Sequence, residues 1–92
     1  MIISAEVDCI IYDAQSLKGK RAVLKRITKR LQNEFNIAVS ELDFQDLWQR
    51  TRIGLVTIAS DKVIAEQTMQ QALTFIDSFP EIERAETHLE WL

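Results

Sequence analysis

The spacing of the apolar residues switches between two periods along this chain, and that switching constrains the fold more than any other feature. From residue 2 to residue 12 apolar residues alternate with others, which is the two-residue period of a half-buried β-strand. From residue 17 to residue 35 they recur every three or four positions, as on one face of an amphipathic helix. The strand face expected to be buried carries Ile3, Ala5, Val7, Cys9 and Ile11.

The rest of the chain repeats these two patterns. Residues 37–43 and 50–59 are rich in β-branched side chains, which favour strands, and residues 82–91 alternate again. Ser60-Asp61 opens a second helical pattern, which Pro80 must end because proline lacks the backbone donor. The inward face of that helix should carry Ala65, Met69, Ala72, Leu73 and Ile76. We therefore expect strands near 2–12, 36–43, 49–59 and 82–91, and helices near 16–34 and 61–78, with Ser16 as the first N-cap.

This order, strand-helix-strand-strand-helix-strand, predicts an α+β protein. Right-handed crossovers turn it into a ferredoxin-like sandwich: a four-stranded antiparallel sheet in the spatial order 4-1-3-2, with both helices on one face. Within it, we expect the third strand beside the first and running in the same direction. A chain of 92 residues buries only about 60–65% of its unfolded surface, so residues 1–92 should form a single domain with one thin core.

Composition argues against several function classes. No apolar stretch approaches the roughly 20 residues of a membrane span, and the first residues lack the basic start of a signal peptide. Cys9 is the only cysteine, so we expect no internal disulfide and a cytoplasmic protein. One cysteine and one histidine are too few for a zinc site, and we expect neither a metal nor a cofactor.

Enzyme and carrier signatures known from this fold class are missing. Residues 12–16 lack the glycines and arginine of an acylphosphatase loop, and the third strand lacks the stacking aromatics of an RNA-recognition motif. A heavy-metal carrier needs two neighbouring cysteines, whereas Cys9 is expected to be a buried structural thiol. His88 is the sole candidate general base; we expect an exposed strand histidine, with catalysis or metal binding as the alternative. We predict that the protein is not an enzyme.

Two motifs carry a family resemblance: Gln15-Ser16-Leu17-Lys18 at the first helix, and Gln45-Asp46-Leu47-Trp48-Gln49-Arg50 between the second and third strands. On these motifs the chain resembles, over essentially its whole length, the YlxP-like family of small bacterial proteins, a domain of unknown function. The resemblance implies a ferredoxin-like fold, a bacterial cytoplasmic protein and, through neighbouring genes for translation-initiation and ribosome-binding factors, a link to ribosome assembly. It implies no catalytic residues. Gly19 stands where many members have an acid that completes a capping box, at a cost of about 0.5–1 kcal/mol.

The first helix is strongly basic. Residues 14–33 contain seven lysines and arginines and no acid, although the whole chain has a formal charge of −3. At 100° per residue most of these cations share a flank beside the apolar stripe, and Lys20 lies near the stripe itself. Cations in the first turns oppose the helix dipole, and such a broken local rule often marks function. We predict phosphate contacts from Lys18, Lys20, Arg21, Lys25 and Lys29. The alternatives are a solvated helix face or a membrane-surface contact.

The motif between the second and third strands has two interpretations. In the first, Leu47 and Trp48 cap the end of the core. In the second, Trp48 is an exposed anchor, and the polar side chains around it read RNA or protein. The motif residues singled out as a candidate site are Gln45, Asp46, Trp48, Gln49 and Arg50.

The sheet face away from the helices is predicted to be an interface. With odd positions of the first strand inward, one end of this face is charged, with Glu6, Asp8, Glu41, Asp43, Arg50, Arg52, Glu86, His88 and Glu90. The other end is apolar, with Ile10, Tyr12, Ile37, Val39, Val56, Ile58 and Ile82. A patch of this size is unusual on a monomer, so we expect a second copy to cover it in a two-fold dimer, and otherwise a partner protein. An opposite phase of the third strand, or the C-terminal residues folding over the patch, would remove it.

The sequence as a whole favours a non-enzymatic RNA- or ribosome-associated factor that binds phosphates through the first helix. Five phosphate contacts predict a slope of about −3.5 to −4.5 in log affinity against log salt. The alternative is a protein-interaction or dimerisation module with no nucleic-acid role. A small hydrolase is a distant third.

Overall fold

The computed structural model describes residues 1–92 as four strands and two helices. They follow one another as β1 (Ile2–Ile11), α1 (Leu17–Glu34), β2 (Ala38–Asp43), β3 (Arg50–Ile58), α2 (Lys62–Asp77) and β4 (Ile82–Trp91). Each predicted element is present, and its ends lie within two residues of the expected ones. The class is α+β, as the two alternating periods predicted.

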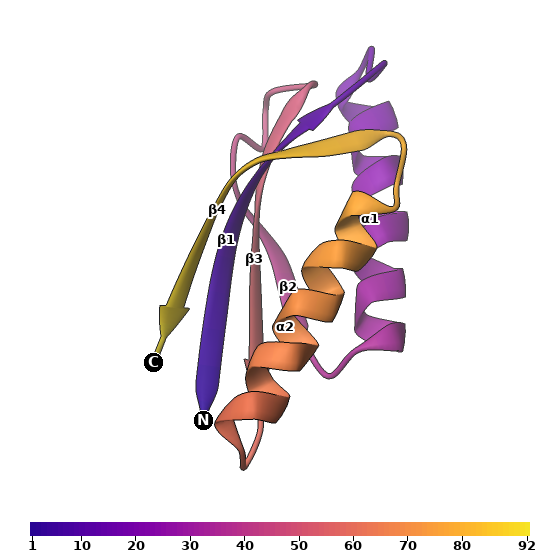
Figure 1. Ribbon diagram of the computed structural model, residues 1–92. Helices are drawn as coiled ribbons and strands as arrows, with labels where there is room; N and C mark the ends of the chain where they lie inside the picture. The colour runs from indigo at the N-terminus through magenta and orange to yellow at the C-terminus, as the bar shows by residue number, and fades with distance from the viewer.

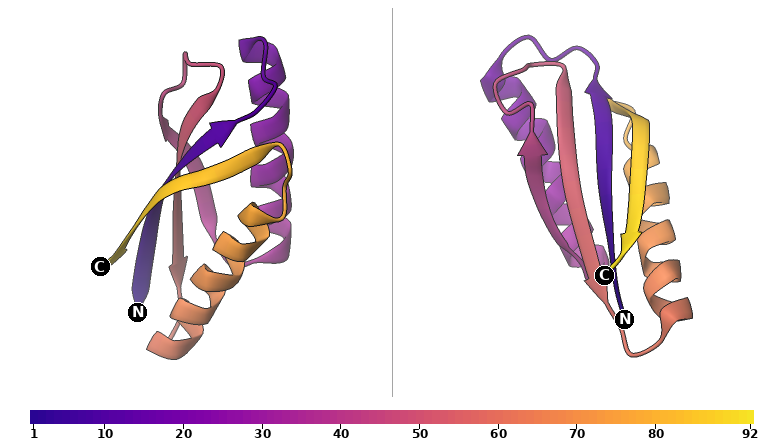
Figure 2. Two further views of the ribbon diagram at one scale, coloured as in Figure 1. Left: turned by 45° about the horizontal axis from the view of Figure 1, so that its top comes forward. Right: turned by 90° about the vertical axis from the view of Figure 1, so that its left-hand side faces the viewer.

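The four strands form one antiparallel sheet in the order β2-β3-β1-β4, which is the predicted 4-1-3-2 read from the other edge. The right-hand view of Figure 2 looks onto this sheet and shows the four strands in that order. The expectation that β3 runs parallel to β1 was wrong, since Ile2 lies opposite Ile58 and Ile10 opposite Arg50. The crossover through α1 makes β2 parallel to β1. The loop after β2 then reverses the chain, so β3 lies between β2 and β1 and runs antiparallel to both.

Both helices cover the same face of the sheet, and the opposite face is open (Figures 1 and 2). The odd-numbered residues of β1, from Ile3 to Ile11, are all buried against the helices. So are the five residues predicted on the inner face of α2. Burial of Cys9 in this core raises the pKa of its thiol to about 12, which keeps it protonated and unreactive at neutral pH.

Side-chain caps begin both helices. Ser16 is the N-cap of α1, where its Oγ accepts a hydrogen bond from the backbone N–H of Gly19 at 2.9 Å. Asp61 is the N-cap of α2, and its Oδ1 accepts from the N–H groups of Val63 and Ile64 at 2.7 and 3.3 Å. These bonds satisfy backbone donors that a helix start leaves free, as the sequence predicted for Ser16.

The phase of β2 differs from the prediction. Ile37 and Val39 were expected on the open face, but both pack against the core. Glu41 also points to the helix side, because it pairs with Ile53 just as Val39 pairs with Leu55. A register shift between Glu41 and Asp43 then returns Asp43 to the open face. A register shift of this kind moves the side chains on one side of it to the other face of the sheet, and the alternation of apolar residues in the sequence does not reveal it.

A second register shift changes the phase of β4. Leu89 and Trp91 lie opposite Ala5 and Ile3 on the helix side, as predicted, but before the shift Ile82 lies opposite Ile11. Ile82 was expected on the open face and is instead buried in the core. The predicted apolar interface therefore loses three members, Ile37, Val39 and Ile82.

Replacing Gly19 by alanine should stabilise the protein by about 0.5–1 kcal/mol, because glycine inside a helix carries a conformational entropy cost. The added Cβ would lie 3.3 Å from Ser16 Oγ, so the hydroxyl must yield by a few tenths of an ångström, which its exposed position allows. Urea unfolding measures the gain. The reverse change at the exposed Ala22, Ala22→Gly, is the control and should cost a similar amount. A loss of stability in Gly19→Ala would mean that the Ser16 cap cannot move.

Candidate nucleic-acid interface

Three of the seven cations of α1 are engaged within the fold. Lys20 is completely buried, and its Nζ lies 2.5 Å from the carbonyl oxygen of Phe44 and 3.0 Å from Glu41 Oε2. Arg26 forms an ion pair with Glu81. The guanidinium of Arg30 lies 5.2 Å from the ring centroids of both Phe75 and Phe79.

Lys20 was predicted to contact phosphate, and the structure contradicts this. Lys20 lies on the core side of α1, where its ammonium group pairs with Glu41. The Glu41 side chain was expected on the open face, whereas it points to the helix side of the sheet. Thr51 Oγ1 also donates to Glu41 Oε2, at 2.6 Å. The result is a polar network of Lys20, Glu41, Thr51 and the Phe44 carbonyl. Its ion pair and hydrogen bonds offset the cost of burying the lysine charge.

The other four cations are exposed and form no ion pair with any carboxylate of the chain. They follow one another along one side of α1 at spacings of three, four and four residues, over about 16 Å at 1.5 Å per residue. We call them the basic stripe: Lys18, Arg21, Lys25 and Lys29. The opposite flank of α1 carries Arg26 and Arg30, which contact Glu81 and α2. The basic stripe therefore faces away from α2.

The loop between β2 and β3 begins with a residue in an uncommon conformation. Phe44 has φ 61°, in the left-handed region that bulky residues rarely adopt. Its N–H donates to Asp43 Oδ1 at 2.7 Å, and its carbonyl accepts from Lys20 Nζ and, at 3.0 Å, from the N–H of Leu47. The guanidinium carbons of Arg50 and Arg52 lie 4.7 and 5.1 Å from its ring centroid. These contacts offset the backbone strain and fix the start of the loop.

The other end of this loop is also fixed. The carbonyl of Gln49 accepts from the N–H of Ile11 at 2.9 Å, and its side-chain Nε2 donates to the carbonyl of Ala14 at 3.4 Å. The loop is therefore tied to the connection between β1 and α1. In the alternative interpretation Gln45, Gln49 and Arg50 read a ligand. Gln49 and Arg50 also make contacts within the fold, whereas Gln45 and Asp46 are exposed and make no side-chain hydrogen bond.

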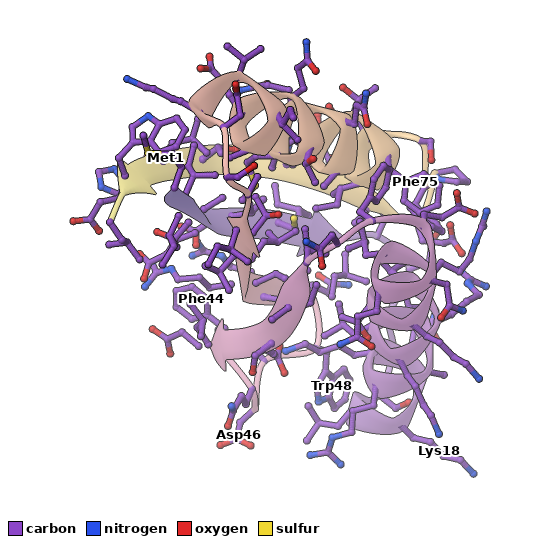
Figure 3. The ribbon with its side chains drawn as sticks, turned by 90° about the horizontal axis from the view of Figure 1, so that it is seen from below. Met1, Lys18, Phe44, Asp46, Trp48 and Phe75 are labelled. Carbon is purple, nitrogen blue, oxygen red and sulfur yellow. The ribbon has the colours of Figure 1, made fainter.

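Leu47 and Trp48 lie at the surface. Their side chains are 49% and 51% exposed, so the interpretation that they cap the core was wrong. Trp48 has the exposure that the alternative interpretation requires, and its role as an anchor stays a prediction. Figure 3 shows the Trp48 side chain beside α1, while Asp46 points away from the helix. The loop thus presents an indole toward the first turns of α1, while its own carboxylate points away from the helix.

The open face of the sheet does not carry the contiguous apolar patch predicted for it. Because β1 and β3 are antiparallel, Ile10 and Tyr12 lie at one end of the face, and Val56 and Ile58 at the other. Between them, Arg52 Nε lies 2.7 Å from Asp8 Oδ1, and Arg52 Nη1 lies 3.4 Å from Asp43 Oδ2. The hydroxyl of Tyr12 donates to Glu83. Charged and hydrogen-bonded groups therefore divide the apolar residues of this face.

The hydrogen bond and charge of Arg52 lower the pKa of Asp8, although its burial acts in the opposite direction. A carboxyl with a lowered folded pKa contributes stability above its unfolded value of about 3.9, and loses that contribution as the pH falls through the folded value. We expect Asp8→Asn to cost about 1–2 kcal/mol at pH 7 in urea unfolding, and the gap to the native protein to close below about pH 4. Asp46→Asn, which removes a carboxylate without an ion pair, is the control. A gap of constant size down to pH 2 would contradict the assignment.

Groups suited to catalysis or metal binding are sparse. His88 is exposed on the open face, opposite Glu6 on β1. No group of three histidine, cysteine or carboxylate side chains is arranged to hold a metal ion. Neither helix is long and apolar enough to cross a membrane.

Comparison with known proteins places the chain among its relatives. The model of the family described as "Protein of unknown function (DUF503)" matches residues 2–89. The chain belongs to this family. One relative, "Uncharacterized protein YlxP" of Bacillus subtilis (strain 168), is 58% identical over 91 residues, which cover 99% of each chain. The family resemblance read from the loop and helix motifs is confirmed.

Two solved structures share the fold at low sequence identity. The "De novo designed protein Foldit4" superposes with a TM-score of 0.61 at 15% identity, covering 100% of this chain and 99% of that one. A C-terminal segment of the alpha subunit of aIF2 from Pyrococcus abyssi superposes with a TM-score of 0.53 at 20% identity, covering 97% of this chain and 48% of that one. At such identities the likeness concerns the fold alone.

Proposed function

We propose that this protein is a non-enzymatic, RNA- or ribosome-associated factor of the bacterial cytoplasm that binds phosphates through the basic stripe. One observation carries the proposal: the fold engages three cations of α1 and leaves four in a row with no carboxylate partner. Four unpaired charges along one side of a helix repel one another, and Lys18 in the first turn also opposes the helix dipole, so the basic stripe has no evident structural gain. The phosphates of an RNA backbone would neutralise all four charges.

The distribution of charge supports an oriented encounter with RNA. The chain is acidic overall, with a formal charge of −3, while the basic stripe lies on one side of α1. On the open face of the sheet Glu6, Asp8, Asp43 and Glu90 outnumber Arg50 and Arg52, and the net negative charge would repel a phosphate backbone there. RNA would therefore approach the protein from the α1 side.

A binding role also agrees with the chemistry of the chain. Cys9 is buried with a raised pKa, which makes it a poor nucleophile. We assign the antiparallel sheet with two helices on one face to the ferredoxin-like class, whose members include many unrelated functions, so the class itself decides nothing.

Co-sedimentation with purified ribosomal subunits at low salt tests the proposal. Lys18→Gln, Arg21→Gln and Lys25→Gln together remove three charges of the basic stripe, and this triple variant should stay in the supernatant. The matched control is Gln67→Glu, Gln70→Glu and Gln71→Glu on the exposed side of α2, which changes the net charge by the same amount. The control should sediment like the native protein. Equal sedimentation of the triple variant and the native protein would overturn the proposal.

A second candidate function is self-association, which one exposed apolar corner favours. β4 is an edge strand, and Leu89 and Trp91 near its end are each 40% exposed. The first turn of α2 lies beside them, with Lys62 Nζ 5.2 Å from the Trp91 ring and with Val63 and Ile64 exposed. A second copy could pair with this edge and cover the corner. Sedimentation equilibrium decides: the native protein should be a dimer that Leu89→Asp converts to a monomer, and a monomeric native protein would exclude this function.

A further inference from the structure

We infer that Trp48 is a stacking platform for an unpaired base, so that the RNA bound by the basic stripe is single-stranded. The inference rests on the proposed function and names the class of RNA that it requires. It starts from the β2–β3 loop, whose exposed indole has no role in the core.

The loop holds Trp48 in place while leaving it exposed. On one side Phe44 takes a strained conformation held by Lys20, Asp43 and two arginines. On the other side Gln49 is hydrogen-bonded to Ile11 and Ala14. Both ends of the loop are fixed, yet the indole between them is half exposed. The fold therefore gains little stability from this ring. Such preorganisation is typical of a group that meets a ligand.

The position of Trp48 matches its proposed partner. Its side chain lies beside α1, and Asp46 of the same loop points away (Figure 3). On the helical wheel Arg21 lies on the flank of α1 opposite to Arg26 and Arg30, that is, on the flank away from α2. The contacts of Lys20 with Phe44 and of Gln49 with Ala14 hold the loop against the start of α1, so the indole lies at the same end of the helix as Lys18 and Arg21. A row of cations that tracks a backbone, with an aromatic ring for a base beside it, is the arrangement that binds single-stranded nucleic acids.

A duplex would not use this arrangement. In an A-form helix the bases are stacked and the deep groove is closed to side chains, so an indole beside the phosphates would meet only backbone. A protein interface has an apolar centre, whereas in this loop Leu47 alone accompanies Trp48 as an exposed apolar side chain, beside the exposed Gln45, Asp46 and Gln49. Unpaired RNA satisfies both the charge and the ring.

Fluorescence of Trp48 tests the inference directly. The Trp91→Phe variant leaves Trp48 as the only tryptophan. Single-stranded oligoadenylate should bind this variant and quench the emission of Trp48. A blunt duplex with the same number of phosphates should bind more weakly and leave the emission unchanged. In the same background Trp48→Ala should weaken single-strand binding by about tenfold or more, and Trp48→Phe should retain most of it, since stacking needs an aromatic face. Unfolding curves of both variants confirm that the exposed site does not alter the fold.

The outcomes separate this inference from the proposed function. If the duplex binds as tightly as the single strand and Trp48→Ala changes nothing, while neutralising the basic stripe abolishes binding, the inference fails and the proposed function stands. If neither RNA binds and ribosomal subunits are not bound either, both fail. If subunits bind but only through a protein component, with no quenching by any RNA, the partner is a protein and the inference also fails.

Discussion

Replacing Lys20 by methionine should destabilise the protein by about 2–4 kcal/mol, the largest loss expected from replacing any one of the seven cations of α1. Methionine matches the length of the lysine stem and fills the same space among apolar neighbours, so the loss is due to the charge. Without the ammonium group Glu41 keeps only the hydroxyl of Thr51 as a partner, and the carbonyl of the strained Phe44 loses a donor. Urea unfolding measures the difference in the free energy of unfolding.

Lys18→Met is the matched control, because Lys18 is exposed and forms no ion pair, and its replacement should change stability by less than about 0.5 kcal/mol. Adding Glu41→Leu to Lys20→Met should restore much of the lost stability, since an apolar pair can replace a buried ion pair at little cost. A Lys20→Met variant as stable as the native protein would show that the buried network contributes nothing.

Periodicity predicted the elements and most of the core, because burial on one face imposes its period on the sequence. It failed where the backbone breaks that period. The register shifts in β2 and β4 turned Val39 and Ile82 inward, although alternation alone favoured the open face for both. The direction of β3 was a different failure. It follows from the connections of the chain, and the mistaken direction had gathered Ile10 and Ile58 at one end of the sheet.

The candidate site was predicted in part for a related reason. Charge and helical spacing identified the basic stripe, but they could not separate Lys20 from it without the inward phase of Glu41. The position of Lys20 near the apolar stripe of α1 was the one available signal. For Trp48 the sequence left two interpretations open, because exposure depends on how the loop is tied to Ala14 and Lys20, contacts that join distant parts of the chain.

The affinity of the native protein for single-stranded RNA should fall with salt with a slope of about −2.8 in log affinity against log salt, since the basic stripe offers four phosphate contacts rather than five. In the Lys18, Arg21 and Lys25 to Gln triple variant one contact remains, and the slope should become shallower, at about −0.7. At about 0.1 M salt the same loss corresponds to roughly a hundredfold weaker binding. Fluorescence titrations at several salt concentrations give both quantities.

Lys20→Met should leave that salt slope unchanged, even though it removes a positive charge from the same helix and costs far more stability than any change in the basic stripe. The reason is that the Lys20 ammonium is fully buried against Glu41 and the Phe44 carbonyl, so it releases no counterion when RNA binds. Lys25→Gln should do the opposite, making the slope shallower by about 0.7 with little effect on the free energy of unfolding. The comparison is made in buffer without denaturant, where both variants are folded. A slope that falls equally in the two variants would mean that RNA senses only the total charge of α1, and the division of its cations into structural and binding groups would be wrong.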